Sequence, residues 1–133
     1  MRSRSPLVID GLAGALSAAM NLADEFEHCH AVALTDARGV VVDFLVFAAE
    51  DHTAESAIAA GARRTAHHPG ATRAVLVSVL KCVDLSCPTE LDLDAWHSAG
   101  RRFARAGVEL TEWLLASGKL FRSLALTVEK LAY

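Results

Sequence analysis

Two histidines carry the strongest chemical signal in the sequence. His28 and His30 stand at the start of an apolar run, and side chains two positions apart in a strand point to the same face, as metal ligands must. Cys29 or Cys82 would add a thiolate, although no third ligand stands at a recognised zinc spacing. The structural interpretation is two histidines at a strand edge. Lys81 beside Cys82 also suggests a thiol nucleophile, but no histidine stands nearby in sequence to act as its base.

Arginines form the second group of candidates. A basic patch for phosphate backbones would use Arg101, Arg102 and Arg105, together with Arg63, Arg64 and Arg73. Solvated helix faces explain the same residues. The net charge of -3 favours that second explanation and argues against a nucleic-acid partner.

The composition indicates one compact domain. The 133 residues are 53% hydrophobic and 22% charged, with a mean hydropathy of +0.30, which excludes a disordered chain. The three cysteines lack C-x-x-C spacing, so we expect no disulfide framework and a cytoplasmic location. Arg2 and Arg4 precede the apolar run 7–20 and faintly resemble a signal peptide. Asp10 interrupts that run, which is too short to cross a bilayer, and we expect no membrane association.

The first half of the chain reads as a helix followed by a hairpin. Ser5 and Pro6 predict a helix start, and apolar residues recur at helical spacing up to Phe26. Apolar runs 31–34 and 40–47 flank a turn sequence at 36–39, which predicts a β-hairpin. The second run is almost continuous, so we expect it to be buried on both faces.

The second half alternates strands with helices. Thr53 is placed to cap a helix, and 74–80 reads as a central strand that is buried on both faces. A further helix ends at Gly107, and strands 108–115 and 119–126 follow. The order α-β-β-α-β-α-β-β predicts a three-layer α-β-α sandwich around a mixed sheet. We expect one domain over 1–133, with an N-terminal helix in 1–27, a core in 28–126 and a tail in 127–133.

This order and several local sequences resemble the RadC-like branch of the JAB/MPN metallopeptidase family, which has a cytidine-deaminase-like fold. Glu27-His28, the strand after it and the turn at 36–39 are similar to the family's Glu-His, strand and Asp-rich turn. The segments 107–113 and 118–125 are similar to its last two strands. The resemblance covers about 27–125 and rests on pattern rather than on an intact motif.

The resemblance implies an active site that has been lost. The family's two zinc-binding histidines fall on Lys81 and Val83 when its aspartate is placed on Asp94. Neither a protonated lysine nor a valine offers a lone pair to a metal. The family's motif proline falls on Asp84, its serine on Leu91, and its catalytic glutamate within one residue of Glu27. The chain is therefore similar to a degenerate member that lacks the zinc motif. The vestigial pocket would comprise Glu27, Lys81, Cys82, Val83, Asp84, Leu91 and Asp94.

We therefore expect a catalytically inactive domain that acts as a binding or scaffold module and needs no cofactor. We expect a homodimer or a protein partner, since the apolar runs near the end of the chain exceed what a small core needs. The candidate interface residues are Trp113, Leu115 and Phe121. The Lys81 ammonium should lie within ion-pair distance of Asp94 or Glu27. The alternative is a hydrolase with a rebuilt metal or thiol site around His28, His30 and Cys82.

Overall fold

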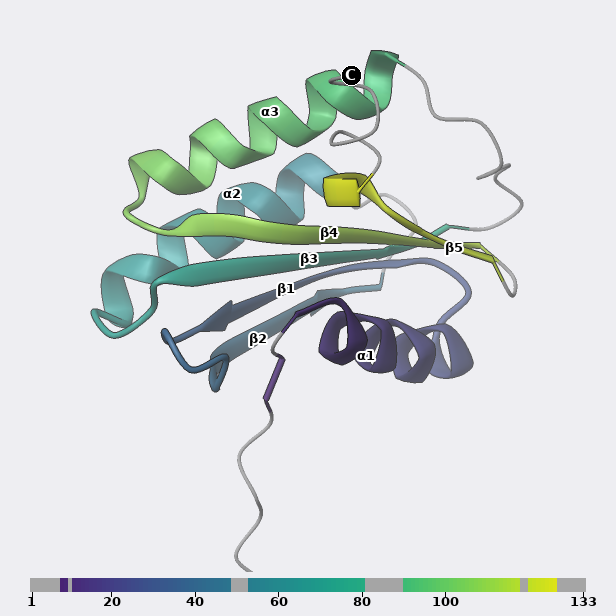
Figure 1. Ribbon diagram of the computed structural model, residues 1–133, viewed down its shortest axis with the longest axis horizontal. Coiled ribbons are helices and arrows are strands. Elements are labelled where there is room, and N and C mark those ends of the chain that lie inside the picture. Colours follow the sequence, from purple (N-terminus) through teal and green to yellow (C-terminus); the bar gives the residue numbers. More distant parts are fainter. Residues whose placement is uncertain (1–7, 10, 49–52, 81–89, 118–119, 127–133) are drawn as a thin grey trace, which may run out of the picture.

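A five-stranded mixed sheet forms the centre of the molecule, with helices on both faces (Figure 1). The computed structural model describes residues 8–9, 11–48, 53–80, 90–117 and 120–126. Its elements, in chain order, are α1 (Gly11–Glu25), β1 (Cys29–Thr35), β2 (Val41–Phe47), α2 (Ala54–Arg64), a 3-10 turn (Thr65–His67), β3 (Arg73–Val79), α3 (Glu90–Arg105), β4 (Glu109–Ser117) and β5 (Leu120–Ser123). The predicted α/β class with a mixed sheet is confirmed.

The strand order is β2-β1-β3-β4-β5. β1 runs antiparallel to both β2 and β3, β3 is parallel to β4, and β4 is antiparallel to β5. Cys29 at the start of β1 pairs with Val79 at the end of β3, which in turn pairs with Ala116 near the end of β4. We call this end of the sheet the carboxyl edge. The chain also leaves the sheet at the carboxyl edge after β2, toward α2, and after β3, toward α3. The ends of several strands therefore lie close together at this edge.

β3 is the buried central strand that the sequence predicts. It occupies the middle position of the sheet, and every residue from Ala74 to Val79 is buried. A run with Ser78 as its only polar residue has no side suited to solvent. The prediction for this strand is confirmed.

The β1–β2 hairpin is also confirmed, and its turn chemistry is local. Asp36 Oδ1 accepts hydrogen bonds from the backbone N–H groups of Arg38 and Val40, at 2.8 and 3.0 Å. Gly39 adopts a φ of 83°, a left-handed conformation that glycine takes without steric cost. An Asx-type turn that ends in glycine is a standard way to reverse a chain between two strands.

The prediction that β2 is buried on both faces is wrong. None of its seven residues is fully buried, and Val42 and Val46 are 36% and 37% exposed. β2 is the outermost strand on its side of the sheet. Within the described residues, only an isolated bridge from Val8 to Val40 lies beyond it. An apolar run has the same local pattern in an edge strand as in a central strand.

Two element boundaries also differ from the prediction. The first helix begins at Gly11, because Val8 and Ile9 are extended and the Ile9 N–H donates to the Gly39 carbonyl at 2.8 Å. The last strand ends at Ser123, where residues 124–126 turn helical. Ser123 Oγ accepts from the Leu126 N–H at 3.1 Å and so caps this turn. In both cases a tertiary or capping hydrogen bond overrides the apolar pattern.

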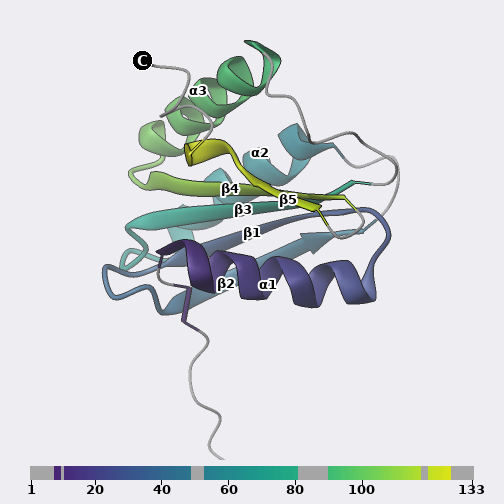
Figure 2. The same ribbon diagram turned by 45° about the vertical axis from the view of Figure 1, so that its right-hand side comes forward.

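The two faces of the sheet are covered unequally. α2 and α3 lie over one face and α1 lies alone over the other (Figures 1 and 2). The larger apolar cluster lies between the sheet and α2 and α3, and Phe103 of α3 is fully buried in it. Thr53 caps α2 as predicted, since its Oγ1 accepts from the Ser56 N–H at 3.2 Å. No helix among the described residues has the length and apolar character needed to cross a membrane.

Candidate functional site

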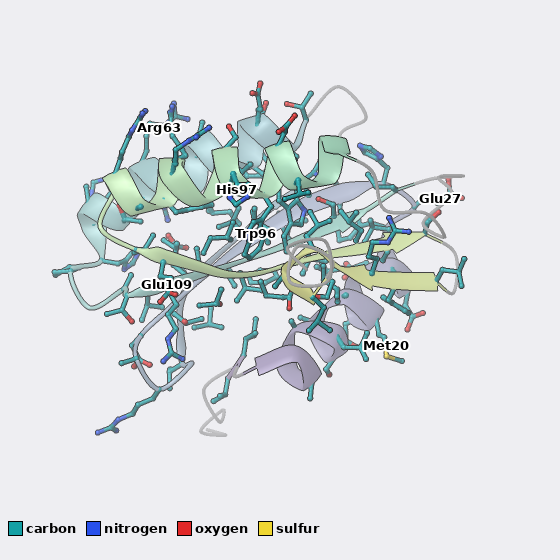
Figure 3. All side chains as sticks on the ribbon, turned by 45° about the horizontal axis from the view of Figure 1, so that its top comes forward. Met20, Glu27, Arg63, Trp96, His97 and Glu109 are labelled. Atoms are coloured by element: carbon teal, nitrogen blue, oxygen red, sulfur yellow. The ribbon has the colours of Figure 1, made fainter. Side chains whose placement is uncertain are left out.

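Most of the vestigial-pocket residues fall outside the described part of the chain. Lys81, Cys82, Val83 and Asp84 lie outside it, as does the side chain of Leu91 in α3. Glu27 and Asp94 are described, and both are exposed. Glu27 lies at the end of the sheet opposite Glu109, which starts β4 (Figure 3). The expected ion pair of Lys81 stays a prediction.

The predicted juxtaposition of the two histidines is confirmed. The rings of His28 and His30 meet edge to face, with centroids 5.2 Å apart and planes at 90°. His30 is buried at 6% exposure. The Nε2 atom of His28 is also buried and has no hydrogen-bond partner. The pair lies at the carboxyl edge, because His30 pairs with Ser78 near the end of β3.

His30 belongs to a hydrogen-bond network in the core. Its Nδ1 lies 2.8 Å from Ser78 Oγ, and the indole Nε1–H of Trp113 donates to the same oxygen at 3.0 Å. Indole is a donor only, so the Ser78 hydroxyl must accept from Trp113 and either donate to His30 or accept from it. Ser78 is 2% exposed. A serine next to a histidine suggests a nucleophile, but a hydroxyl closed off from substrate holds strands together instead.

Cys29 cannot join the two histidines. It is fully buried in the cluster under α1, on the opposite face of the sheet from His30. Burial raises the pKa of its thiol, so the thiolate form that binds metal is disfavoured. Among the described residues, no three His, Cys, Asp or Glu side chains are grouped so that they could hold a metal ion.

The structure corrects the candidate interface. Trp113 and Leu115 are 6% and 8% exposed and belong to the core cluster under α2 and α3. The Leu115 side chain is therefore covered within the folded chain, whereas the small exposed part of Trp113 lines a groove between α2 and α3. Phe121 is half-buried and packs against the cluster under α1. Because helices cover both faces of β4, most of its apolar residues are needed for the core and are not left over for an interface.

A groove of about 730 Å³ lies between α2 and α3 and reaches Trp113 of β4. Trp113, Ile58 and Ala99 line it, and all three are buried or nearly so. One side carries the arginines of α3, and the other side carries the first turns of α2. The groove lining consists of Thr53, Ala54, Glu55, Ser56, Ile58, Ala59, Ala95, Ser98, Ala99, Arg101, Arg102, Arg105 and Trp113.

The charges in the groove are unbalanced. Arg101, Arg102 and Arg105 are exposed, and in the described part of the chain none of them forms an ion pair. Glu55 is the one acidic residue in the lining. The chain as a whole has a charge of -3, so its charge is distributed unevenly and this groove is locally positive.

Asp43 on β2 holds the most extensive ion pairing in the described residues. Its Oδ2 accepts from Arg64 Nε at 2.8 Å and lies 3.1 Å from His68 Nε2. The Arg64 hydrogen bond lowers the pKa of the Asp43 carboxyl, and the smaller contributions include the bond from His68. Asp43 therefore ties the edge strand to the end of α2, which is a structural role.

A comparison with protein-family models finds no match for this chain, and a comparison with curated proteins finds no significant relative.

Sequence reasoning missed two features of these sites. From the sequence, Ser78 was interpreted as the one polar residue of a buried strand. Trp113 was interpreted as a candidate interface residue. A buried serine needs a hydrogen-bond partner, which was the available signal for the network. The arginines were recognised, but their spacing does not reveal that α2 leaves a groove beside them.

Proposed function

We propose that this protein is a binding module without hydrolase activity, and that it associates with a second copy of itself through β2. The observation that carries the proposal is the exposed outer strand. β2 presents Val42 and Val46 to solvent, and Asp43, its one charged residue, is engaged with Arg64. Edge strands are normally protected by lysine, proline or a bulge that turns the edge away. β2 contains neither lysine nor proline, and its one register shift against β1 falls at Val42, which leaves the pairing of residues 43–47 regular.

The sequence of β2 is suited to pairing with itself. A two-fold axis at Phe44 would place Val42 of one copy opposite Val46 of the other, in antiparallel orientation. The exposed valines would then cover each other, and cross-strand pairs of β-branched residues stabilise a sheet. Among the described residues, the bridge from Val8 involves Val40 and none of Val41–Phe47.

Absence of catalysis is supported by the residue types at the family's motif positions. Lys81 and Val83 stand where the resemblance places zinc ligands. The alternative, a hydrolase with a rebuilt site around His28, His30 and Cys82, has less support because His30 is engaged with Ser78; Cys82 lies outside the described residues. Metal analysis of protein purified without an affinity tag tests that alternative, since stoichiometric zinc would favour it.

Sedimentation equilibrium tests self-association, over roughly 1–100 µM, the range of transient dimers. We expect a monomer–dimer equilibrium that Val46→Lys shifts to monomer, because a lysine on the strand edge opposes pairing. Met20→Lys is the matched control, since Met20 is also exposed (51%) but projects from α1 (Figure 3). A monomer at every concentration, or equal weakening by both substitutions, would contradict the proposal.

A further inference from the structure

The groove between α2 and α3 has a mainly positive lining. Three arginines stand along α3, at 101, 102 and 105, and one glutamate stands opposite them. Arg102 and Arg105 lie in the last turn of α3, where a cation also stabilises the helix dipole. Stabilisation of the helix dipole explains the positive charge of Arg102 and Arg105. It explains neither the groove beside these arginines nor the presence of Arg101.

The opposite side of the groove adds hydroxyl groups and the positive end of a helix dipole. The Thr53 and Ser56 hydroxyls lie 3.2 Å apart at the N-terminus of α2. The first turn of this eleven-residue helix carries a partial positive charge, although the Thr53 hydroxyl already accepts from the Ser56 N–H. Both sides therefore favour carboxylates, and Glu55 alone opposes them.

The floor of the groove is apolar. Ile58, Ala99 and Trp113 supply it, and Ala59 and Ala95 lie at its margins as small side chains. The Nε1–H of Trp113 is directed to Ser78, so this ring presents carbon surface rather than its polar group to the groove. A floor of this kind favours an aliphatic side chain over a phosphate group.

We propose that this groove binds an acidic segment of a partner protein, with carboxylates on the arginines and one aliphatic side chain on the floor. A positive groove with an apolar base suits a peptide that alternates these two properties. A nucleic acid fits less well, because the overall charge is -3 and the lining offers three cations beside a glutamate. No lining residue belongs to β2, so this proposal does not depend on self-association.

Fluorescence anisotropy tests the proposal with a short labelled peptide of alternating Glu and Gly around one central Leu. We expect saturable binding that weakens as the ionic strength rises, because exposed charges are screened by salt. Replacing the Glu residues by Lys should abolish binding, and replacing the Leu by Ala should weaken it. A peptide that binds equally well with Ala at the centre would overturn the role of the floor.

Protein variants locate the site. Arg102→Glu should weaken binding by roughly tenfold or more, since charge reversal replaces attraction with repulsion. Arg63→Glu is the matched control, because Arg63 projects from α2 outside the groove lining (Figure 3) and should bind like the native chain. Thermal unfolding followed by circular dichroism checks that both variants fold.

Three outcomes would overturn the proposal. These are no saturable binding, an equal loss in Arg63→Glu and Arg102→Glu, or tighter binding of a single-stranded oligonucleotide through the same arginines. The last outcome would assign the groove to nucleic acid. Because sedimentation of the β2 variant is measured separately, failure of either proposal leaves the other intact.

Discussion

The buried hydroxyl of Ser78 stabilises the fold by bonding to side chains on two neighbouring strands. The Ser78 hydroxyl lies between an indole N–H and an imidazole nitrogen, and it connects β3 to both of its neighbouring strands. Leaving a buried donor without a partner costs more than a satisfied hydrogen bond contributes. The network therefore fixes the pairing of β1, β3 and β4 near the carboxyl edge.

Removing this hydroxyl should destabilise the protein. Ser78→Ala leaves the Trp113 N–H without its acceptor, and we expect the free energy of unfolding to fall by about 1–3 kcal/mol. Urea denaturation measures the change. Ser98→Ala, at an exposed site on α3, should change it by less than about 0.5 kcal/mol. If Ser78→Ala proves as neutral as Ser98→Ala, the network does not stabilise the fold.

Asp43 predicts how stability depends on pH. Its folded pKa is lowered below the ordinary value of 3.8, mainly by the Arg64 hydrogen bond. A lowered carboxyl pKa stabilises the fold above the ordinary value, and this contribution is lost as the pH falls through the folded pKa. We expect Asp43→Asn to be less stable than the native chain at neutral pH, and the difference to shrink below pH 3.8.

Chemical denaturation at a series of pH values measures the effect of Asp43→Asn. Asp24→Asn is the control, because Asp24 is an exposed carboxylate on α1 and should give a small difference. A difference for Asp43→Asn that stays constant down to acidic pH would show that its ion pairs do not couple to folding.

At the scale of the elements, α2 approaches the sheet through a glycine. A Cβ at Gly61 would lie 2.7 Å from Val32 Cγ1 and 3.3 Å from Phe103 Cε1, so glycine lets α2 pack closely on β1. Gly100 in α3 has nothing within 4 Å of the same position. The two glycines are thus a matched pair, since both lie within helices but only one is in close contact.

Alanine should have opposite effects at these two positions. Gly61→Ala should lower the free energy of unfolding by about 1–3 kcal/mol, because Val32 is β-branched and buried and cannot move away. Gly100→Ala should raise it by roughly 0.5–1 kcal/mol, since alanine favours the helix. Thermal unfolding of the two variants measures both effects. Similar changes in both would show that close packing at Gly61 does not matter.

Local patterns predicted the elements that depend on local chemistry. The turn after Asp36, the cap at Thr53 and the left-handed Gly107 just after α3 were all foreseen, since each needs only a few neighbouring residues. The exposure of β2 was not predicted, because the position of a strand in the sheet depends on pairing with distant parts of the chain.

For the candidate site too, the local features could be predicted from the sequence and the long-range contacts could not. The common face of His28 and His30 follows from the alternation of a strand and was predicted. Their connection to Trp113 was not, because it runs through Ser78, which is 48 residues from His30 and 35 from Trp113. The groove depends on how two helices are offset over the sheet, and no periodicity in either helix contains that information.

At the scale of the molecule, unequal covering of the sheet determines which regions open first. β1 and β3 lie in the interior with hydrogen bonds on both sides, whereas β2 ends the sheet. Opening free energies rise with burial and with the number of neighbouring strands. The strand that we propose as the dimer contact is therefore one of the two that end the sheet, and it should open more readily than β3.

Hydrogen exchange should rank the strands accordingly. We expect the amides of β3 to exchange only on global unfolding and those of β2 to exchange faster, because β2 is exposed and has one neighbouring strand. Raising the protein concentration should slow exchange in β2 selectively if this strand pairs with a second copy. Mass spectrometry of peptides from the two strands measures both rates. Faster exchange in β3 than in β2 would contradict the strand order.

The strand β1 has a consequence for how the chain reaches this fold. Its two partners differ greatly in sequence distance, since β2 follows after a short turn while Ser78 of β3 is 48 residues beyond His30. Closing a short loop costs less chain entropy than closing a long one, and hairpins form within microseconds. We therefore expect the β1–β2 hairpin to form early and to present β1 as a template. The slow step would then be the arrival of β3, together with α2, on that template.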